Sequence, residues 1–242
     1  MNKFYKSAMF VACLFVTTLT TSCVTQNTAS IVPDEQFIFI KQDYVANVCN
    51  LLTGECKRGL AKESGSGVII GHDLAKNKSY ILTAAHVCIA GPVPDQIPPY
   101  IKYDIPLSNL VVYDSKNRSH NAKIFAFDRT TDLCLVESER IDRHAITLAK
   151  KAPENRDRVT NVAAPYGMWK DGTGVLYEGS FFHILGRDAY YTLTVMPGSS
   201  GSPIVNKSGK LVGIISRGTD NGEVAISPTY GQIRTFLEEN PF

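Results

Sequence analysis

The sequence has no apolar run long enough to cross a membrane as a helix, and no excess of charge of either sign. Its longest apolar run near the N-terminus falls far short of the roughly 20 residues that a spanning helix needs, which excludes a polytopic membrane protein. Lysine and arginine number 25 against 23 aspartate and glutamate residues, and no basic stripe or acidic tail is present. We therefore expect no nucleic-acid partner.

The sequence also lacks long amphipathic helical stretches until its end. Short runs rich in β-branched and aromatic residues alternate with turn clusters instead. These runs occupy residues 37 to 41, 67 to 71, 80 to 84, 110 to 114, 123 to 127, 133 to 137, 190 to 195 and 210 to 216. With 44% hydrophobic residues in 242, the chain can bury a sizeable core. The pattern predicts an all-β fold of antiparallel barrels or a sandwich.

One helix is predicted near the C-terminus, at about residues 228 to 239. Ser227 can cap it, Pro228 suits its first position, and apolar residues recur on one face after them. Residues 90 to 106 are rich in proline and are predicted to form a surface loop.

Residues 1 to 22 have the layout of a secretory signal peptide, with two lysines, an apolar stretch and then small residues. Cys23 follows directly, which resembles the lipobox of bacterial lipoproteins, although Thr20 stands where that signal usually has leucine. We expect lipidation at Cys23, with ordinary cleavage nearby as the alternative, and a tether over residues 23 to 35. Both interpretations export the protein, and lipidation would anchor it to a membrane in a bacterial cell envelope or periplasm.

Export makes disulfides possible among the cysteines that follow the leader. Cys49 and Cys56 bracket a short segment with a Thr-Gly turn signal, so a hairpin disulfide is predicted, with two reduced thiols as the alternative. Cys88 and Cys134 can form a second disulfide or remain two buried thiols. No second close pair of cysteine or histidine residues supplies further ligands, so no metal site is expected.

Three segments, each beside a strand-like run, supply one histidine, one aspartate and one serine. They are TAAHV at residues 83 to 87, TTDLCLV at 130 to 136 and PGSSGSPIV at 197 to 205. Nucleophilic acyl transfer needs a hydroxyl to attack, an imidazole to take and return its proton, and a carboxylate to orient the imidazole and stabilise its cation. The candidate catalytic residues are His86, Asp132 and Ser200.

The glycines around Ser200 have a separate task. Gly198 and Gly201 permit a tight turn, so that the backbone N–H groups of Gly198 and Ser200 could converge on a developing oxyanion. Such a donor is worth about 3 to 4 kcal/mol of transition-state stabilisation.

Together these pieces resemble the chymotrypsin-like serine peptidases, and most of all the bacterial trypsin-like branch that includes the Deg/HtrA proteases. The resemblance covers about residues 64 to 228. SGSGVII and YILTAAHV resemble the strands that lead to the catalytic histidine, DRTTDLCLVE the aspartate segment, VTNVAAPYG the opening of the second barrel, and PGSSGSPIVNKSGKLVGIISRG the nucleophile loop with its following strand. The resemblance implies a His86, Asp132 and Ser200 triad, with oxyanion donors at Gly198 and Ser200.

The resemblance also implies two packed six-stranded antiparallel β-barrels, over about residues 36 to 150 and 151 to 228, in a peptidase domain of residues 36 to 242. It implies no cofactor. The chain ends soon after the predicted helix, which leaves no room for the PDZ domains of many Deg/HtrA relatives, so we expect a monomer without trimer or cage assembly.

Alignment with the family indicates where a polypeptide substrate would bind. The floor of the primary pocket falls near Thr194, and Ile215, Ser216, Arg217 and Gly218 would line the cleft where the peptide adds as an extra strand. No carboxylate is expected there to pair with a basic side chain, and no histidine to receive a glutamate. We therefore expect an endopeptidase that cleaves after small or medium apolar residues.

Other classes of protein fit less well. An α/β-hydrolase needs its histidine after the serine, whereas no histidine follows Ser200. A subtilisin-like fold requires helices between parallel strands, which the pattern lacks. The main alternative is a lipoprotein that keeps the barrels as a binding module and has lost turnover. A structural envelope protein is a weaker one.

Overall fold

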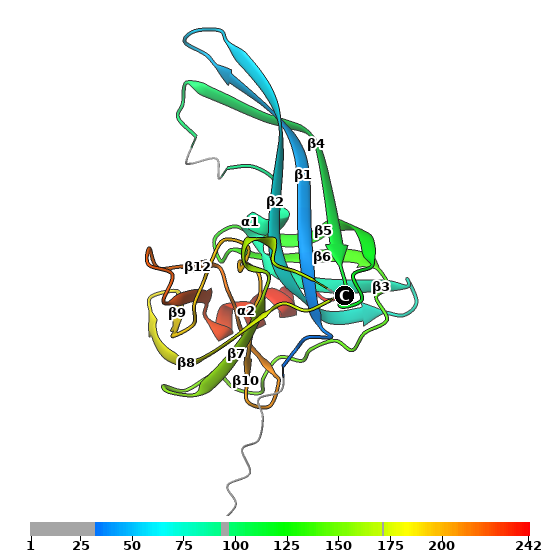
Figure 1. The fold of residues 1–242 in the computed structure, drawn as a ribbon, viewed down its shortest axis with the longest axis vertical. Coiled ribbons are helices and arrows are strands. Elements are labelled where there is room, and N and C mark those ends of the chain that lie inside the picture. The colour runs from blue at the N-terminus through cyan, green and yellow to red at the C-terminus, as the bar shows by residue number, and fades with distance from the viewer. Residues whose placement is uncertain (1–31, 93–96, 171) are drawn as a thin grey trace, which may run out of the picture.

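The computed structural model describes residues 32–92, 97–170 and 172–242 (Figure 1). The predicted leader, the predicted lipidation site at Cys23 and most of the predicted tether lie outside the described residues. Within the described ranges, no helix has the length and apolar character needed to cross a membrane.

Six antiparallel strands close the first unit into a barrel with the order β1-β2-β3-β6-β5-β4. Their bounds are β1 Phe37–Asn50, β2 Cys56–Asp73, β3 Lys78–Ala84, β4 Ile101–Tyr113, β5 Ser119–Asp128 and β6 Leu133–Glu139. Their β-branched side chains fill the interior, where Ile38, Ile69 and Ile81 are fully buried. A four-residue helix, α1 (Ala85–Cys88), follows β3 directly.

The second unit is an antiparallel sheet with the order β11-β10-β7-β8-β9-β13-β12. Its strands are β7 Arg158–Ala163, β8 Val175–Leu185, β9 Asp188–Tyr191, β10 Pro203–Asn206, β11 Leu211–Ile214, β12 Arg217–Gly218 and β13 Ala225–Pro228. The prediction of an all-β fold in two antiparallel units with a C-terminal helix is confirmed.

The second unit has seven strands where a six-stranded barrel was expected, because its closing strand is interrupted. β11 pairs with β10, and β12 pairs with β13, at the opposite end of the strand order. Only Ile215 and Ser216 separate β11 from β12. There the Ile215 N–H donates to the Ser202 carbonyl and the Ser216 N–H donates to the Ile226 carbonyl, so one chain segment changes partner as it crosses between the two ends of the sheet.

A shared core joins the two units and the C-terminal helix. Barrel residues such as Val68 and Leu135 pack with Val205 and Ile214 of the second sheet. Phe236 of helix α2 (Tyr230–Glu239) completes this cluster. The surface between the two units is therefore apolar and buried, which fixes the position of one relative to the other.

Helix α2 begins two residues later than the sequence predicted. Thr229 is its N-cap and forms a capping box with Gln232. Ser227, the predicted cap, belongs to β13, where its fully buried hydroxyl accepts a hydrogen bond from the Ile214 N–H and donates to the Pro228 carbonyl. Because the Ser227 hydroxyl is bonded within the sheet, it does not cap the helix.

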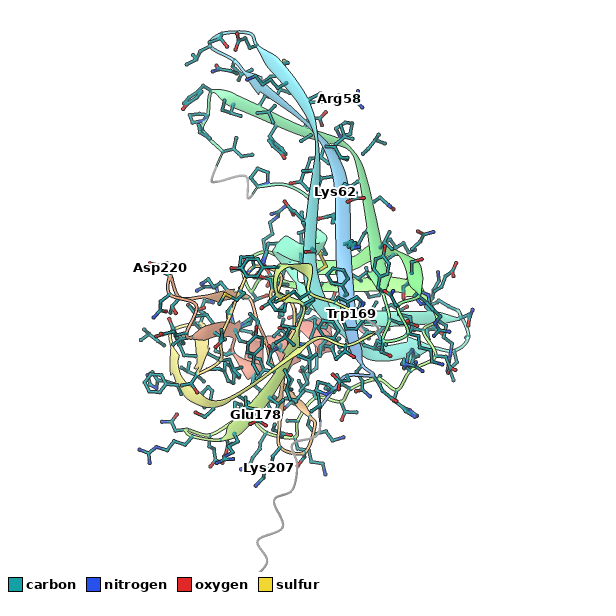
Figure 2. All side chains as sticks on the ribbon, viewed as in Figure 1. Arg58, Lys62, Trp169, Glu178, Lys207 and Asp220 are labelled. Atoms are coloured by element: carbon teal, nitrogen blue, oxygen red, sulfur yellow. A yellow bond between two sulfur atoms is a disulfide. The ribbon has the colours of Figure 1, made fainter. Side chains whose placement is uncertain are left out.

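The outer parts of β1, β2 and β4 form an arm (residues 45 to 62 and 101 to 107) that projects from the barrel in Figure 1. The predicted proline-rich loop is wrong from Ile101 onward, because β4 starts there. Pro106, which has no N–H, lies at a bulge where the β1–β4 register shifts. Figure 2 shows Arg58 and Lys62 on this arm. The predicted disulfide between Cys49 and Cys56 is present near its tip.

Candidate active site

His86 and Asp132 meet because β3 and β6 are paired neighbours. Ala84, the last residue of β3, pairs with Leu133, the first residue of β6. His86 follows the end of β3 within α1, and Asp132 directly precedes β6, so both lie at the same end of the strand pair. The strand register, rather than sequence proximity, brings them together across 46 residues.

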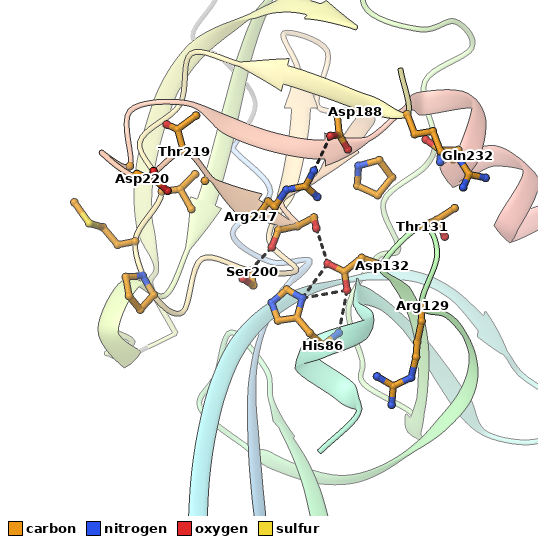
Figure 3. Close-up of a pocket in the computed structure, with 18 of the residues that line it drawn as sticks. His86, Arg129, Thr131, Asp132, Asp188, Ser200, Arg217, Thr219, Asp220 and Gln232 are labelled. Carbon is orange, nitrogen blue, oxygen red and sulfur yellow. Dashed lines mark hydrogen bonds and ion pairs between the residues drawn. The ribbon is translucent and has the colours of Figure 1, made fainter. Parts of the chain in front are cut away.

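Asp132 binds α1 through its backbone and through its side chain, and Figure 3 shows the side-chain contacts with His86. Its carbonyl accepts a hydrogen bond from the Ala85 N–H at 3.1 Å, and its Oδ1 accepts one from the His86 N–H at 3.0 Å. The ring Nδ1 of His86 lies 2.9 Å from Oδ2. Asp132 has a φ of 54°, a left-handed conformation that is uncommon for a residue other than glycine and that such interactions must stabilise.

A third donor reaches the same carboxylate from the second unit. The Ser216 hydroxyl donates to Asp132 Oδ2 at 2.5 Å. Burial by itself raises the pKa of Asp132, but hydrogen bonds from the His86 ring, from Ser216 and from the His86 N–H, together with the histidine's charge, outweigh it and hold the pKa below its ordinary value. The carboxylate is therefore ionised near neutral pH and can stabilise a positively charged imidazole.

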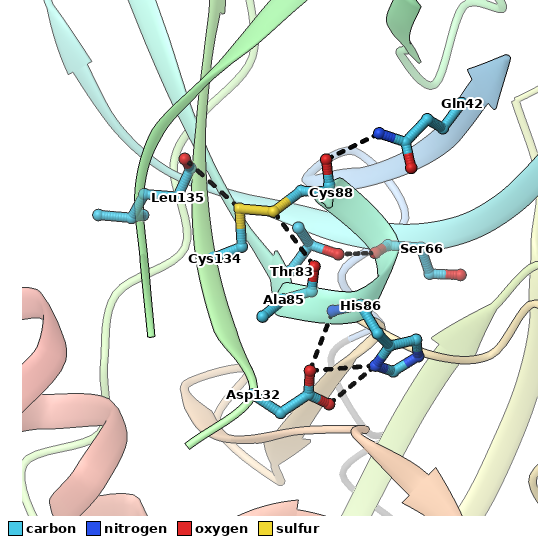
Figure 4. The surroundings of a disulfide bond; sticks show 9 residues. All are labelled: Gln42, Ser66, Thr83, Ala85, His86, Cys88, Asp132, Cys134 and Leu135. Atoms are coloured by element: carbon cyan, nitrogen blue, oxygen red, sulfur yellow. Dashed lines mark hydrogen bonds and ion pairs between the residues drawn. A yellow bond between two sulfur atoms is a disulfide. The ribbon is translucent and has the colours of Figure 1, made fainter. Parts of the chain in front are cut away.

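A disulfide joins the two elements that carry His86 and Asp132 (Figure 4). Cys88 of α1 and Cys134 of β6 are bonded, with their Cα atoms 6.6 Å apart, and both residues are fully buried. The sequence left this pair open, and the structure contains the bond. It crosslinks the histidine segment to the aspartate segment two residues beyond each candidate.

Ser200 lies in a tight loop (residues 196 to 202) that two glycines make possible. Gly198 and Gly201 have φ values of +96° and +82°, which side chains of other residues rarely allow. A Cβ at Gly201 would lie 2.1 Å from the Ser66 carbonyl oxygen, so only glycine fits against β2 there. The loop is held by hydrogen bonds from the Ser199 N–H to the Met196 carbonyl and from the Gly201 N–H to the Ile215 carbonyl.

Two backbone N–H groups of this loop have no acceptor among the described residues, those of Gly198 and Ser200. The Pro197 carbonyl accepts a hydrogen bond from the Tyr166 N–H at 2.5 Å. Because the C=O and N–H of a trans peptide point in opposite directions, the Gly198 N–H of this peptide bond points away from Tyr166. The loop therefore holds two backbone donors, at Ser200 and two residues before it, that no described residue uses.

The Ser200 hydroxyl donates to the Ser216 carbonyl at 3.3 Å. Within the described residues, no hydrogen bond joins it to His86, although Figure 3 shows the His86 ring beside Ser200. Catalytic hydrogen bonds are often long in unliganded enzymes and tighten when substrate binds.

All three candidates line one cleft of about 810 Å³. Of the predicted substrate-binding residues, Ser216, Arg217 and Gly218 line it as well. Thr194, the predicted pocket floor, is exposed and does not line the cleft, and Ile215 is fully buried in the core of the second unit.

The sequence missed Asp188 in this cleft, whose carboxylate lies 2.6 Å from the Arg217 guanidinium. Asp188 opens a short strand, and no local pattern marks it as a cleft residue. Among the described residues, no group of three His, Cys, Asp or Glu side chains is arranged to hold a metal ion.

Residues 65–214 match the family described as the trypsin-like peptidase domain. This is more than half of the chain, so the chain belongs to the trypsin-like peptidases. No curated protein sequence matches it.

Two bacterial proteases illustrate the structural similarity. The active form of Rv3671c protease from M. tuberculosis has a TM-score of 0.61 and 15% identity, with 86% of this chain and 82% of that chain covered. The serine endoprotease from Yersinia pestis has a TM-score of 0.58 and 23% identity, with 81% of this chain covered. The chain spans 62% of that protease, less than two thirds of its length. At these identities the likeness concerns the fold alone.

Proposed function

We propose that this protein is a serine endopeptidase that cleaves polypeptides through His86, Asp132 and Ser200. The observation that carries the proposal is the convergence of three distant segments in one cleft. There an ionised carboxylate orients an imidazole beside a serine, and the serine's loop presents two free N–H donors.

In the proposed reaction, the Ser200 hydroxyl attacks the carbonyl carbon of the scissile bond and gives its proton to His86 Nε2. The Gly198 and Ser200 N–H groups bind the oxyanion of the tetrahedral intermediate. His86 then donates its proton to the leaving amine, and the acyl group remains on Ser200. A water molecule repeats the sequence and releases the acid, while Asp132 keeps the histidine tautomer and stabilises its cation.

One observation favours the alternative, a binding module that has lost turnover. The Ser200 hydroxyl donates to the Ser216 carbonyl instead of to His86. If that bond persisted when a peptide was bound, the serine would keep its proton and the cleft would only hold the peptide.

The two functions are distinguished by labelling the purified protein with a fluorophosphonate, followed by peptide mapping of the adduct. We expect labelling at Ser200 that Ser200→Ala and His86→Ala both abolish. A folded, oxidised protein that is not labelled would favour the binding module instead.

The cleft supports the proposed preference for small or medium apolar residues before the cleaved bond. Val195 and Met196, at the start of the nucleophile loop, line it, and a Cβ at Gly218 would lie 3.0 Å from the Val195 Cβ, so the space between Gly218 and Val195 is narrow. Asp220 also lines the cleft. A peptide library varied at the residue before the cleaved bond tests the proposal. A strong preference for arginine or lysine that Asp220→Asn removes would contradict it.

We further propose that the protein is exported and anchored by a lipid on Cys23. The two disulfides support export, since such bonds persist in oxidising compartments. We expect incorporation of a labelled fatty acid that Cys23→Ser abolishes, and a monomeric mass for the detergent-solubilised protein. Release of unlabelled protein into a soluble fraction would favour ordinary cleavage.

A further inference from the structure

Ser66 is a buried residue of β2 that the proposed reaction does not use, yet it touches the nucleophile loop at two points. Its N–H donates to the Ser200 carbonyl at 2.8 Å, and its hydroxyl donates to the Gly198 carbonyl at 2.9 Å. The residue is fully buried. Ser66 therefore holds, from the first barrel, both residues whose N–H groups would bind the oxyanion.

The Ser66 hydroxyl also accepts a hydrogen bond from the Ala164 N–H at 3.2 Å. Ala164 directly precedes the short 3-10 turn Pro165–Gly167, and this turn carries the Tyr166 N–H that binds the Pro197 carbonyl. The Ser66 hydroxyl therefore binds the Gly198 carbonyl directly. It also holds Ala164, which lies two residues before the Tyr166 N–H that binds the Pro197 carbonyl.

The backbone around Ser66 leaves this hydroxyl little freedom. The Ser66 carbonyl accepts a hydrogen bond at 2.7 Å from the hydroxyl of Thr83, a residue near the end of β3 (Figure 4). A Cβ at Gly198 would lie 2.5 Å from the Ala164 carbonyl oxygen, so the loop and the turn are in direct contact. The Gly198 N–H shares a planar peptide unit with the Pro197 carbonyl, so its direction follows from the bond that this carbonyl accepts from the Tyr166 N–H. The Ser66 hydroxyl fixes the Gly198 carbonyl, which belongs to the next peptide unit.

We propose that Ser66 is a positioning residue for the oxyanion site, one that aims the Gly198 N–H without contacting substrate. The expected effect of Ser66 on turnover rests on the proposed function, whereas its expected effect on the backbone of the loop does not. Removing an oxyanion donor costs about 100- to 1,000-fold in kcat, so loosening one should cost less. We expect a loss of roughly tenfold or more.

The test compares Ser66→Ala with Ser79→Ala in the full chain. Ser79 is a matched control in the same barrel: it is also fully buried, and its hydroxyl accepts the Ile141 N–H at 2.8 Å and bonds to the His72 ring at 2.9 Å. Steady-state kinetics on a peptide substrate should give, for Ser66→Ala, a kcat lowered tenfold or more with KM within twofold. For Ser79→Ala, kcat should stay within twofold of the parent protein.

Hydrogen exchange at the Tyr166 amide is the second readout, because Ser66 does not touch that group. Ser66→Ala should speed its exchange at least tenfold, since Ala164 on one side of the Tyr166–Pro197 bond and Gly198 on the other would each lose a hydrogen bond. Ser79→Ala should leave it unchanged. If the parent protein neither turns over nor reacts with the fluorophosphonate, the proposed function fails, and this exchange rate alone decides the positioning proposal.

Three results from folded variants would overturn the proposal. They are an equal fall in kcat in both variants, a Ser66→Ala protein with unchanged kcat and unchanged Tyr166 exchange, and a rise in KM alone. Should Ser66→Ala not fold, Ser66→Cys fills the site with a larger side chain that is only a weak donor, and the same changes are expected from it. Failure of both to fold beside a folded Ser79→Ala would make Ser66 a residue of the fold rather than of the oxyanion site, which also overturns the proposal.

Discussion

The two β units contribute to the cleft in different ways. The first is a closed barrel with strands of 7 to 18 residues, and it holds His86 and Asp132 through strand register and a buried disulfide. The second contains strands as short as two residues and presents Ser200 on a tight loop between β9 and β10. The nucleophile loop is held by hydrogen bonds to the first barrel, so the more regular unit positions the nucleophile loop of the less regular one.

The largest effect should come from removing the disulfide that crosslinks the histidine and aspartate segments. Replacing both Cys88 and Cys134 with alanine removes a crosslink between residues 46 apart in sequence. The chain-entropy model gives a loss of about 4 kcal/mol in the free energy of unfolding for a closed loop of that length. Urea unfolding of the oxidised parent and the variant measures this loss. Turnover should also fall, because His86 and Asp132 would lose their common crosslink. Full activity in a folded variant would show that strand register alone positions them.

Substitution within the nucleophile loop comes next. Gly201→Ala places a Cβ 2.1 Å from the Ser66 carbonyl oxygen at a φ of +82°, so we expect about 3 kcal/mol of destabilisation and loss of turnover. Gly186→Ala is the matched control in the same unit: its φ is +61°, but nothing lies within 4 Å of the added Cβ. For this control we expect about 1 kcal/mol of destabilisation and normal turnover. If thermal unfolding showed equal losses of stability in the two variants, backbone strain, rather than contact with the barrel, would be the cause of the destabilisation at Gly201.

Ser216→Ala tests the bond that crosses between the units to Asp132. A hydrogen bond to a charged group contributes about 2 kcal/mol, and its loss should raise the pKa of Asp132 toward the ordinary value. The lowered pKa means that the ionised carboxylate stabilises the fold above its unfolded pKa of about 3.8, and that this contribution is lost as pH falls toward the folded pKa.

Urea unfolding at pH 7 and pH 3 measures this difference. The variant should be less stable at pH 7 and should lose less stability on acidification than the parent protein. Identical acid sensitivity in the two proteins would mean that the hydroxyl does not set the carboxyl pKa.

The smallest effect is expected at the arm. Cys49 and Cys56 close a short hairpin whose residues are mostly exposed and which lies outside the shared core. Replacing both with serine should lower the free energy of global unfolding by under about 1 kcal/mol, because the exposed hairpin can open locally without unfolding the core. Peptide turnover should stay unchanged. Faster proteolytic nicking at residues 51 to 55 would report the local loosening. A large loss of turnover would indicate that the arm supports the cleft.

Most strand-forming runs could be predicted because β-branched periodicity is a local signal, and the runs at residues 80 to 84 and 133 to 137 fall inside β3 and β6. β4 was missed over residues 101 to 106 because proline there suggested a loop, whereas the β1 edge accepted it at a bulge. Thr194 was placed by alignment and lies outside the cleft. Loop positions depend on distant contacts that a local pattern does not contain.

By itself, the sequence determined the all-β fold, the C-terminal helix, and the serine, histidine and aspartate candidates, because these depend on residue types and on spacing within short segments. Only the tertiary structure decided that Cys88 bonds to Cys134, that Ser216 donates to Asp132, and that Ser66 holds Gly198 across 132 residues. Hydrogen bonds and disulfides between distant segments depend on which strands pair and how two units pack, and those are properties of the whole folded chain.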